Sequence, residues 1–109
     1  MVTKDDPVRA VYTLQKYIVH THAKDGINLL PANPESVYSE MQHDQWDLEP
    51  RFKELPLGQG AVDYPRYLKA LEEIGYKGFL TIERECGANP VADIKLAAAY
   101  LRKVIAENI

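Results

Sequence analysis

The sequence predicts an α/β fold in which two short parallel strands alternate with three helices. Residues 17–22 and 78–83 are rich in the β-branched and aromatic side chains that favour strands. Residues 7–16, 64–74 and 90–105 carry apolar side chains at helical spacing. Strands that alternate with helices pair in parallel through right-handed crossovers, so the predicted order is helix, strand, long loop, helix, strand, helix.

The first predicted helix covers residues 7–16. Asp5 or Asp6 can cap its N-terminus, and Pro7 suits its first turn. The strand at residues 17–22 follows directly and reads YIVHTH. Because side chains alternate along a strand, His20 and His22 are expected on the same face.

A long polar segment, residues 23–62, separates this strand from the next helix. It contains Pro31, Pro34, Pro50 and Pro56, so we predict a loop with a short helical turn near residues 35–41. Loops of this length inside a compact domain are usually functional or disordered. We interpret its final residues, Gly58-Gln59-Gly60, as a tight turn into the helix rather than a phosphate-binding loop.

The second predicted helix, residues 64–74, has clear boundaries. Asp63 is its natural cap, and Gly75 stands where a left-handed residue commonly ends a helix.

The last predicted strand and helix cover residues 78–83 and 90–105. The strand reads GFLTIE and places Thr81 and Glu83 on one face. Asn89 caps the helix. Two parallel strands leave both outer edges unpaired, so further strands are expected to be missing or supplied by another chain.

Composition limits the class of protein. The chain has 109 residues, 46% of them hydrophobic and 27% charged, as expected for one small globular domain. Its formal net charge of −3 argues against nucleic acid and anionic membranes as partners. Cys86 is the single cysteine, so no intrachain disulfide can form. A cytoplasmic location is therefore predicted.

Three side chains at the C-terminal ends of the predicted strands can carry chemistry. In parallel α/β folds, functional residues gather at these strand ends. His20 and His22 lie at the end of the first strand and Glu83 at the end of the second. Neutral imidazole binds Zn, Mn or Co well, so a metal site is one interpretation. The other is that the histidines are structural and that Glu83 is a solvated charge paired with Arg84 or Lys77.

Two stretches resemble a known family. YIVHTHAKDG, residues 17–26, is similar to the seventh strand and following loop of the xylose-isomerase-like TIM-barrel superfamily of sugar phosphate isomerases and epimerases. ELPLGQGAVDYPRYLKALEEIGYKGFLTIERE, residues 54–85, resembles the segment leading through the eighth strand. The resemblance implies a partial TIM barrel: residues 1–109 would be a C-terminal segment with the last two parallel strands and their helices.

The resemblance also implies an activity and a set of site residues. The activity would be divalent-metal-dependent isomerisation or epimerisation of a sugar or sugar phosphate, by proton transfer through a metal-bound enediolate. The cofactor would be Mn, Mg, Co or Zn. The implied residues are His22 and Glu83 as metal ligands, Glu83 also as a catalytic carboxylate, and His20, Lys24 and Asp25 as substrate-binding residues.

The chain departs from the family pattern, and two alternatives stay open. The family site uses about four protein ligands, and the glutamate and aspartate of earlier strands have no counterpart here. The chain is therefore expected to associate with the rest of a barrel or with a second copy. One alternative is a non-catalytic α/β module that associates through open strand edges. The other is an endonuclease IV-like hydrolase, although Phe52, Lys53 and Glu54 stand where that group carries an Asp-x-His pair.

Overall fold

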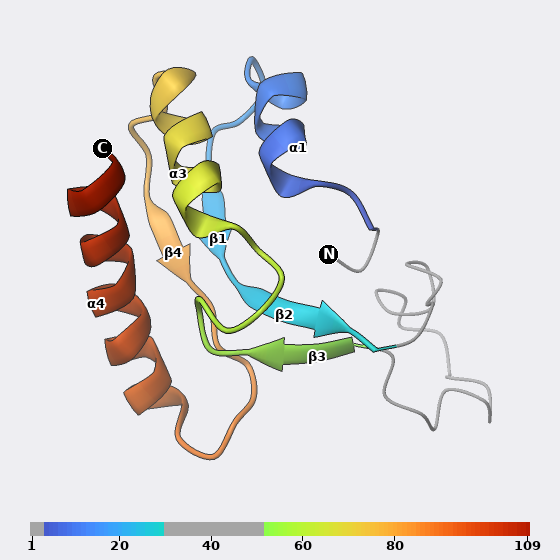
Figure 1. The fold of residues 1–109 in the computed structure, drawn as a ribbon, viewed down its shortest axis with the longest axis vertical. Helices are drawn as coiled ribbons and strands as arrows, with labels where there is room; N and C mark the ends of the chain where they lie inside the picture. The colour runs from blue at the N-terminus through green and yellow to red at the C-terminus, as the bar shows by residue number, and fades with distance from the viewer. Residues whose placement is uncertain (1–3, 30–51) are drawn as a thin grey trace.

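A computed structural model describes residues 4–29 and 52–109, which form short strands and the helices that pack against them (Figure 1). The elements, in chain order, are α1 (Pro7–Leu14), β1 (Thr21–Ala23), β2 (Asp25–Asn28), β3 (Phe52–Leu55), α3 (Tyr64–Glu73), β4 (Leu80–Ile82) and α4 (Pro90–Asn108). The predicted α/β class and the order of helices and parallel strands are confirmed. Among the described residues, no helix is both long and apolar enough to cross a membrane.

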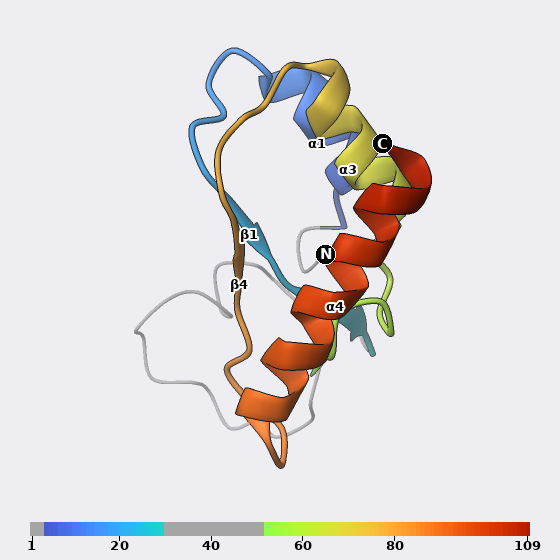
Figure 2. The ribbon, with the colours of Figure 1, turned by 90° about the vertical axis from the view of Figure 1, so that its left-hand side faces the viewer.

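The central feature is the parallel pair β1 and β4. Thr21 pairs with Leu80, His22 with Thr81 and Ala23 with Ile82. In Figure 2 the three helices all lie on one side of these strands. Thr21 and Ala23 are buried, whereas His22 between them is exposed. Alternation along β1 therefore directs His22 to the face that these helices do not cover.

The core lies between the strands and the helices. Its buried apolar residues come from α1, β1, α3, α4 and the turn before α3: Val8, Val11, Ala23, Leu57, Tyr64, Leu68, Ala70, Leu71, Ala97, Leu101 and Val104. This apolar layer holds the helices against one face of β1 and β4, so the strand ends keep a fixed position.

The predicted helix boundaries follow local capping chemistry. Asp6 accepts hydrogen bonds from the N–H groups of Val8 and Arg9, and Asp63 and Asn89 cap α3 and α4 in the same way. Gly75 follows α3 with a φ of 75°, in the left-handed region. The last helix extends to Asn108, three residues beyond the expected end at residue 105.

Both predicted strands are too long. The segment expected as a strand at residues 17–22 turns after α1, where the Tyr17 N–H donates to the Leu14 carbonyl. Regular pairing begins only at Thr21 and ends at Ala23. The expected strand at 78–83 likewise shortens to Leu80–Ile82. Strand propensity marks side chains that suit a sheet, but a partner must lie alongside for pairing to extend.

The prediction of a single loop over residues 23–62 is wrong. It contains the antiparallel pair β2 and β3, in register from Asp25 opposite Leu55 to Asn28 opposite Phe52. A Cβ on Gly26 would lie 2.5 Å from the Lys53 carbonyl oxygen. The two strands can therefore approach this closely only because residue 26 has no side chain. The expected helical turn at residues 35–41 lies outside the described residues.

Candidate functional site

His22 and Glu83 meet at the C-terminal ends of the parallel strands. His22 Nδ1 lies 3.0 Å from Glu83 Oε1, and the two side chains are 50% and 35% exposed. Glu83 directly follows β4, where its N–H donates to the Ala23 carbonyl over 3.1 Å. Backbone pairing therefore continues one residue past the strand and places the carboxylate beside the imidazole.

His20 lies close to this pair. Its Nε2 is 2.9 Å from the Thr81 Oγ1, and its ring meets the His22 ring edge to face at 5.3 Å. His20 was predicted to lie within the first strand, but it immediately precedes β1, which begins at Thr21. It is nevertheless exposed beside His22, where it can contact a ligand held by the pair.

Lys24 lies among three carboxylates. Its Nζ is 3.1 Å from Glu54 Oε2 and 3.9 Å from Glu83 Oε2, and it also contacts Glu85. Partial burial of Lys24 opposes its charge, but the hydrogen bonds to Glu85 and Glu54 outweigh burial and raise the pKa of the ammonium. Tyr64 fixes the backbone at this point, since its hydroxyl donates to the Lys24 carbonyl.

Asp25, the next residue, is fully buried. Its carboxylate accepts hydrogen bonds from the N–H groups of Gly26, Gly58, Gly60 and Val62, at 2.9 to 3.2 Å. These contacts favour a structural role for Asp25, and its expected contact with substrate stays a prediction. The Gly58 and Gly60 amides are also occupied, which agrees with a tight turn rather than a phosphate-binding loop.

Glu54, on β3, is a residue that sequence reasoning missed. Its Oε1 accepts from Arg84 Nη1 at 3.1 Å and from the Glu85 N–H at 2.9 Å, while Oε2 faces Lys24. Burial would raise the pKa of its carboxyl, but the hydrogen bonds from Lys24, Glu85 and Arg84 lower it overall. No local pattern marks Glu54, since its partners are 30 and 31 residues away along the chain.

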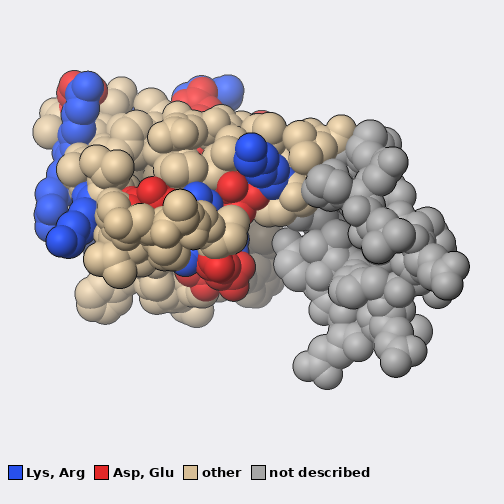
Figure 3. Space-filling model, turned by 90° about the horizontal axis from the view of Figure 1, so that it is seen from below, with Lys and Arg blue, Asp and Glu red and all other residues tan. Residues whose placement is uncertain are grey.

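These charges gather at one end of the molecule. Both parallel strands point toward this end in Figure 1, and Figure 3 views the molecule from it. There, acidic and basic side chains lie against one another. Arg84 joins the cluster to α4 through an ion pair of 2.7 Å with Asp93.

The His22–Glu83 pair fits two ligands of one divalent cation. Donors at about 2.1 Å from a cation and at right angles lie about 3 Å apart, which is the observed separation of Nδ1 and Oε1. Within residues 4–29 and 52–109, however, no group of three or more His, Cys, Asp or Glu side chains is placed to hold a metal. The described part of the chain therefore shows no complete metal site, and the separation of Nδ1 and Oε1 also suits a direct hydrogen bond between His22 and Glu83.

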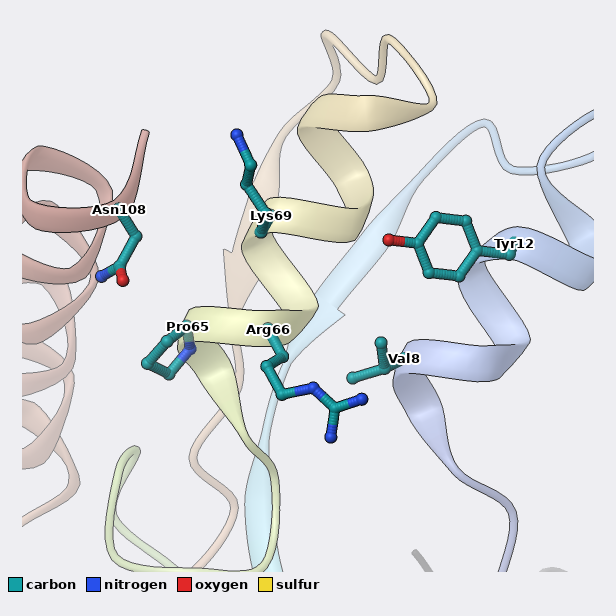
Figure 4. Close-up of a pocket in the computed structure, with 6 residues that line it drawn as sticks. All are labelled: Val8, Tyr12, Pro65, Arg66, Lys69 and Asn108. Carbon is teal, nitrogen blue, oxygen red and sulfur yellow. The ribbon is translucent and has the colours of Figure 1, made fainter.

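A separate groove crosses the helix layer, remote from these residues (Figure 4). It has a volume of about 420 Å³ and is lined by Val8, Tyr12, Pro65, Arg66, Lys69 and Asn108, which come from α1, α3 and α4. None of the predicted site residues lines it, so it gives no support to the predicted chemistry.

Known proteins resemble this chain in sequence and in fold. A family model described as a xylose isomerase-like TIM barrel matches residues 1–104. A crystal structure of a xylose isomerase domain protein from Planctomyces limnophilus superposes with a TM-score of 0.68 at 26% sequence identity.

The match to that structure covers 99% of this chain and 33% of the other, so this chain spans about a third of its length. A search of curated proteins found no match. Because the family model covers nearly the whole sequence, the chain belongs to the xylose isomerase-like TIM barrel family.

Proposed function

We propose that this chain forms part of a divalent-metal-dependent sugar or sugar phosphate isomerase or epimerase. The observation that carries the proposal is the approach of His22 Nδ1 to Glu83 Oε1, at 3.0 Å, at the C-terminal ends of two parallel strands. TIM-barrel enzymes gather their chemistry at these ends. The family membership supports the same class of reaction.

Each side chain has a role in this proposal. His22 and Glu83 would hold a divalent cation, which when bound supplies Lewis-acid polarisation of a substrate carbonyl. The Glu83 carboxylate would accept a proton from the carbon next to that carbonyl. Lys24 and His20 border the pair and would bind substrate oxygens, which suits a carbohydrate with several hydroxyl groups.

Calorimetry of the chain with Mn²⁺ or Co²⁺ tests the proposal. With two ligands among the described residues, we expect weak binding that His22→Ala or Glu83→Ala lowers at least about tenfold, since removing ligand-shell groups typically has effects of this size. Glu107→Gln is the matched control, because this exposed carboxylate on α4 pairs only with Lys103 at 3.9 Å among the described residues. Tight binding that survives both alanine variants would contradict the proposal.

A non-catalytic module that associates through its strands is the second candidate. It is favoured by Val19 and Phe79, which are 87% and 79% exposed beside the parallel pair. Exposed apolar side chains at an open sheet commonly mark an interface. Sedimentation of the chain separates the two candidates: a metal-free dimer that Phe79→Ser converts to monomer would favour the module.

A further inference from the structure

Glu54 connects three segments that converge on the candidate site. From β3 it reaches Lys24, which follows β1, and Arg84 and Glu85, which follow β4. Its side chain is 7% exposed, so its charge is largely removed from water. A buried carboxylate is tolerated only when it is paired, and here two cations and one backbone N–H satisfy it.

The two cations depend on Glu54 to different degrees. Arg84 has a second strong partner in Asp93, at 2.7 Å. The other carboxylates near Lys24 in the described structure are Glu85, which is 71% exposed, and Glu83 at 3.9 Å. An exposed ion pair contributes little. Without the charge on Glu54, the carboxylates left to the Lys24 ammonium are Glu85, which it already contacts, and Glu83, which at 35% is the less exposed of the two.

We propose that Glu54 is a positioning residue that holds the Lys24 ammonium on the β3 side and so leaves the Glu83 carboxylate available to a divalent cation. The inference rests on the proposed role of His22 and Glu83. It goes further in assigning a site role to a residue that touches neither of them.

Glu54→Gln separates this role from simple support of the fold. One side-chain oxygen of glutamine can still accept from the Glu85 N–H and from Arg84. The amide NH₂ group then faces the Lys24 ammonium, which it cannot neutralise. The Glu54→Gln side chain thus keeps the shape of glutamate and one hydrogen-bond acceptor, but it no longer forms an ion pair with Lys24.

The test is a double-mutant cycle read by Co²⁺ binding. Added Co²⁺ shifts and broadens the ring signals of His22 in NMR spectra, which gives an apparent affinity even when binding is weak. We expect Lys24→Gln to raise this affinity modestly when Glu54 is present, because Lys24 Nζ already lies 3.9 Å from Glu83 Oε2, and to raise it by at least about threefold more in Glu54→Gln. If Glu54 acted only as a distant charge, Lys24→Gln would have the same effect in both backgrounds, and that result would overturn the inference.

Asp93→Asn is the matched control. It also removes a carboxylate from Arg84, but it leaves the pair of Glu54 and Lys24 intact. The effect of Lys24→Gln in this background should equal its modest effect in the unsubstituted chain. An effect as large as in Glu54→Gln would overturn the inference.

Two further outcomes are decisive. If Glu54→Gln does not fold, Glu54→Asp takes its place: the charge stays but lies farther from Lys24, and the same non-additivity is expected at smaller size. Co²⁺ binding that leaves the His22 signals unchanged in the unsubstituted chain would overturn the proposed function and this inference with it. An additive cycle with His22 binding intact overturns the inference alone.

Discussion

Residues close together at the strand ends differ in burial: some side chains are exposed to a ligand, and others are buried and stabilise the fold. The imidazole of His22 and the carboxylate of Glu83 are partly exposed, as groups that bind a ligand must be. Asp25, three residues after His22, is fully buried and accepts four backbone hydrogen bonds. Within the HTHAKD segment, the exposed His22 is therefore placed to bind a ligand, whereas the buried Asp25 supports the fold.

Asp25→Asn should destabilise the chain strongly. The asparagine NH₂ group would face backbone N–H groups that now donate hydrogen bonds to the carboxylate. Each buried N–H donor left without an acceptor costs about 1–3 kcal/mol. We expect a loss of about 2–4 kcal/mol in urea unfolding. Asp63→Asn is the control, because asparagine caps helices as well as aspartate does and should change stability by less than about 0.5 kcal/mol. Equal losses in the two variants would contradict the structural role of Asp25.

Glu54 should make the stability depend on pH in the acid range. Its pKa in the folded chain is lowered from the ordinary value of 4.5, so its stabilising contribution is present above that value. The contribution is lost as the pH falls through the lowered pKa. Glu54→Gln should therefore flatten the decline in melting temperature below pH 4.5. Glu107→Gln, which removes an exposed carboxylate on α4, is the control. An identical acid profile for Glu54→Gln and the unsubstituted chain would refute the lowered pKa.

Local sequence patterns predicted residues whose partners are near in the chain and missed Glu54, whose partners are distant. Asp63 and Asn89 could be named as caps because a cap bonds to amides about three residues ahead. Glu54 bonds to groups about thirty residues away, and neither composition nor periodicity encodes such contacts.

At the scale of elements, the helix bounds were predicted closely, whereas the two parallel strands were predicted too long and the pair β2 and β3 was missed. A helix bonds within itself, so apolar spacing and caps define α1, α3 and α4 closely. A strand is only as long as its partner, and β1 and β4 pair over three residues. The pair β2 and β3 escaped prediction because its polar residues lack an alternating apolar pattern and its two strands lie far apart in sequence.

Gly26→Ala tests the packing of β2 against β3. The added Cβ would lie 2.5 Å from the Lys53 carbonyl oxygen and 2.7 Å from the Phe52 ring. Since backbone atoms must shift to admit it, we expect a loss of about 1–3 kcal/mol in urea unfolding. Gly75→Asn is the control: space around Gly75 is open, and asparagine tolerates its positive φ, so a smaller loss is expected. A Gly26→Ala chain as stable as the original would show that the two strands do not pack this closely.

The whole molecule forms part of a TIM barrel. Its helices cover one face of β1 and β4, and the His22 side of these strands stays open in the described structure (Figure 2). The resemblance in sequence anticipated this architecture and the meeting of His22 with Glu83. Under the proposed function, residues beyond His22 and Glu83 would complete the ligand set and select the substrate.

The chain alone should show little or no isomerase turnover. Catalysis of this kind needs a second acid–base group and about four ligands around a catalytic metal, and no group of three or more candidate ligands is found among the described residues. A coupled assay with ketose and aldose substrates and added Mn²⁺ checks this. Sustained turnover that Glu83→Gln does not diminish would assign catalysis to other residues.

Under the proposed function, His22 and Glu83 hold a single divalent cation between them. A crystal of the chain soaked in Mn²⁺ tests it through the anomalous difference map. We predict a peak within about 2.3 Å of His22 Nδ1 and of a Glu83 carboxylate oxygen, the range of such metal–ligand bonds. Manganese bound elsewhere, with His22 and Glu83 separated and without density between them, would contradict the account.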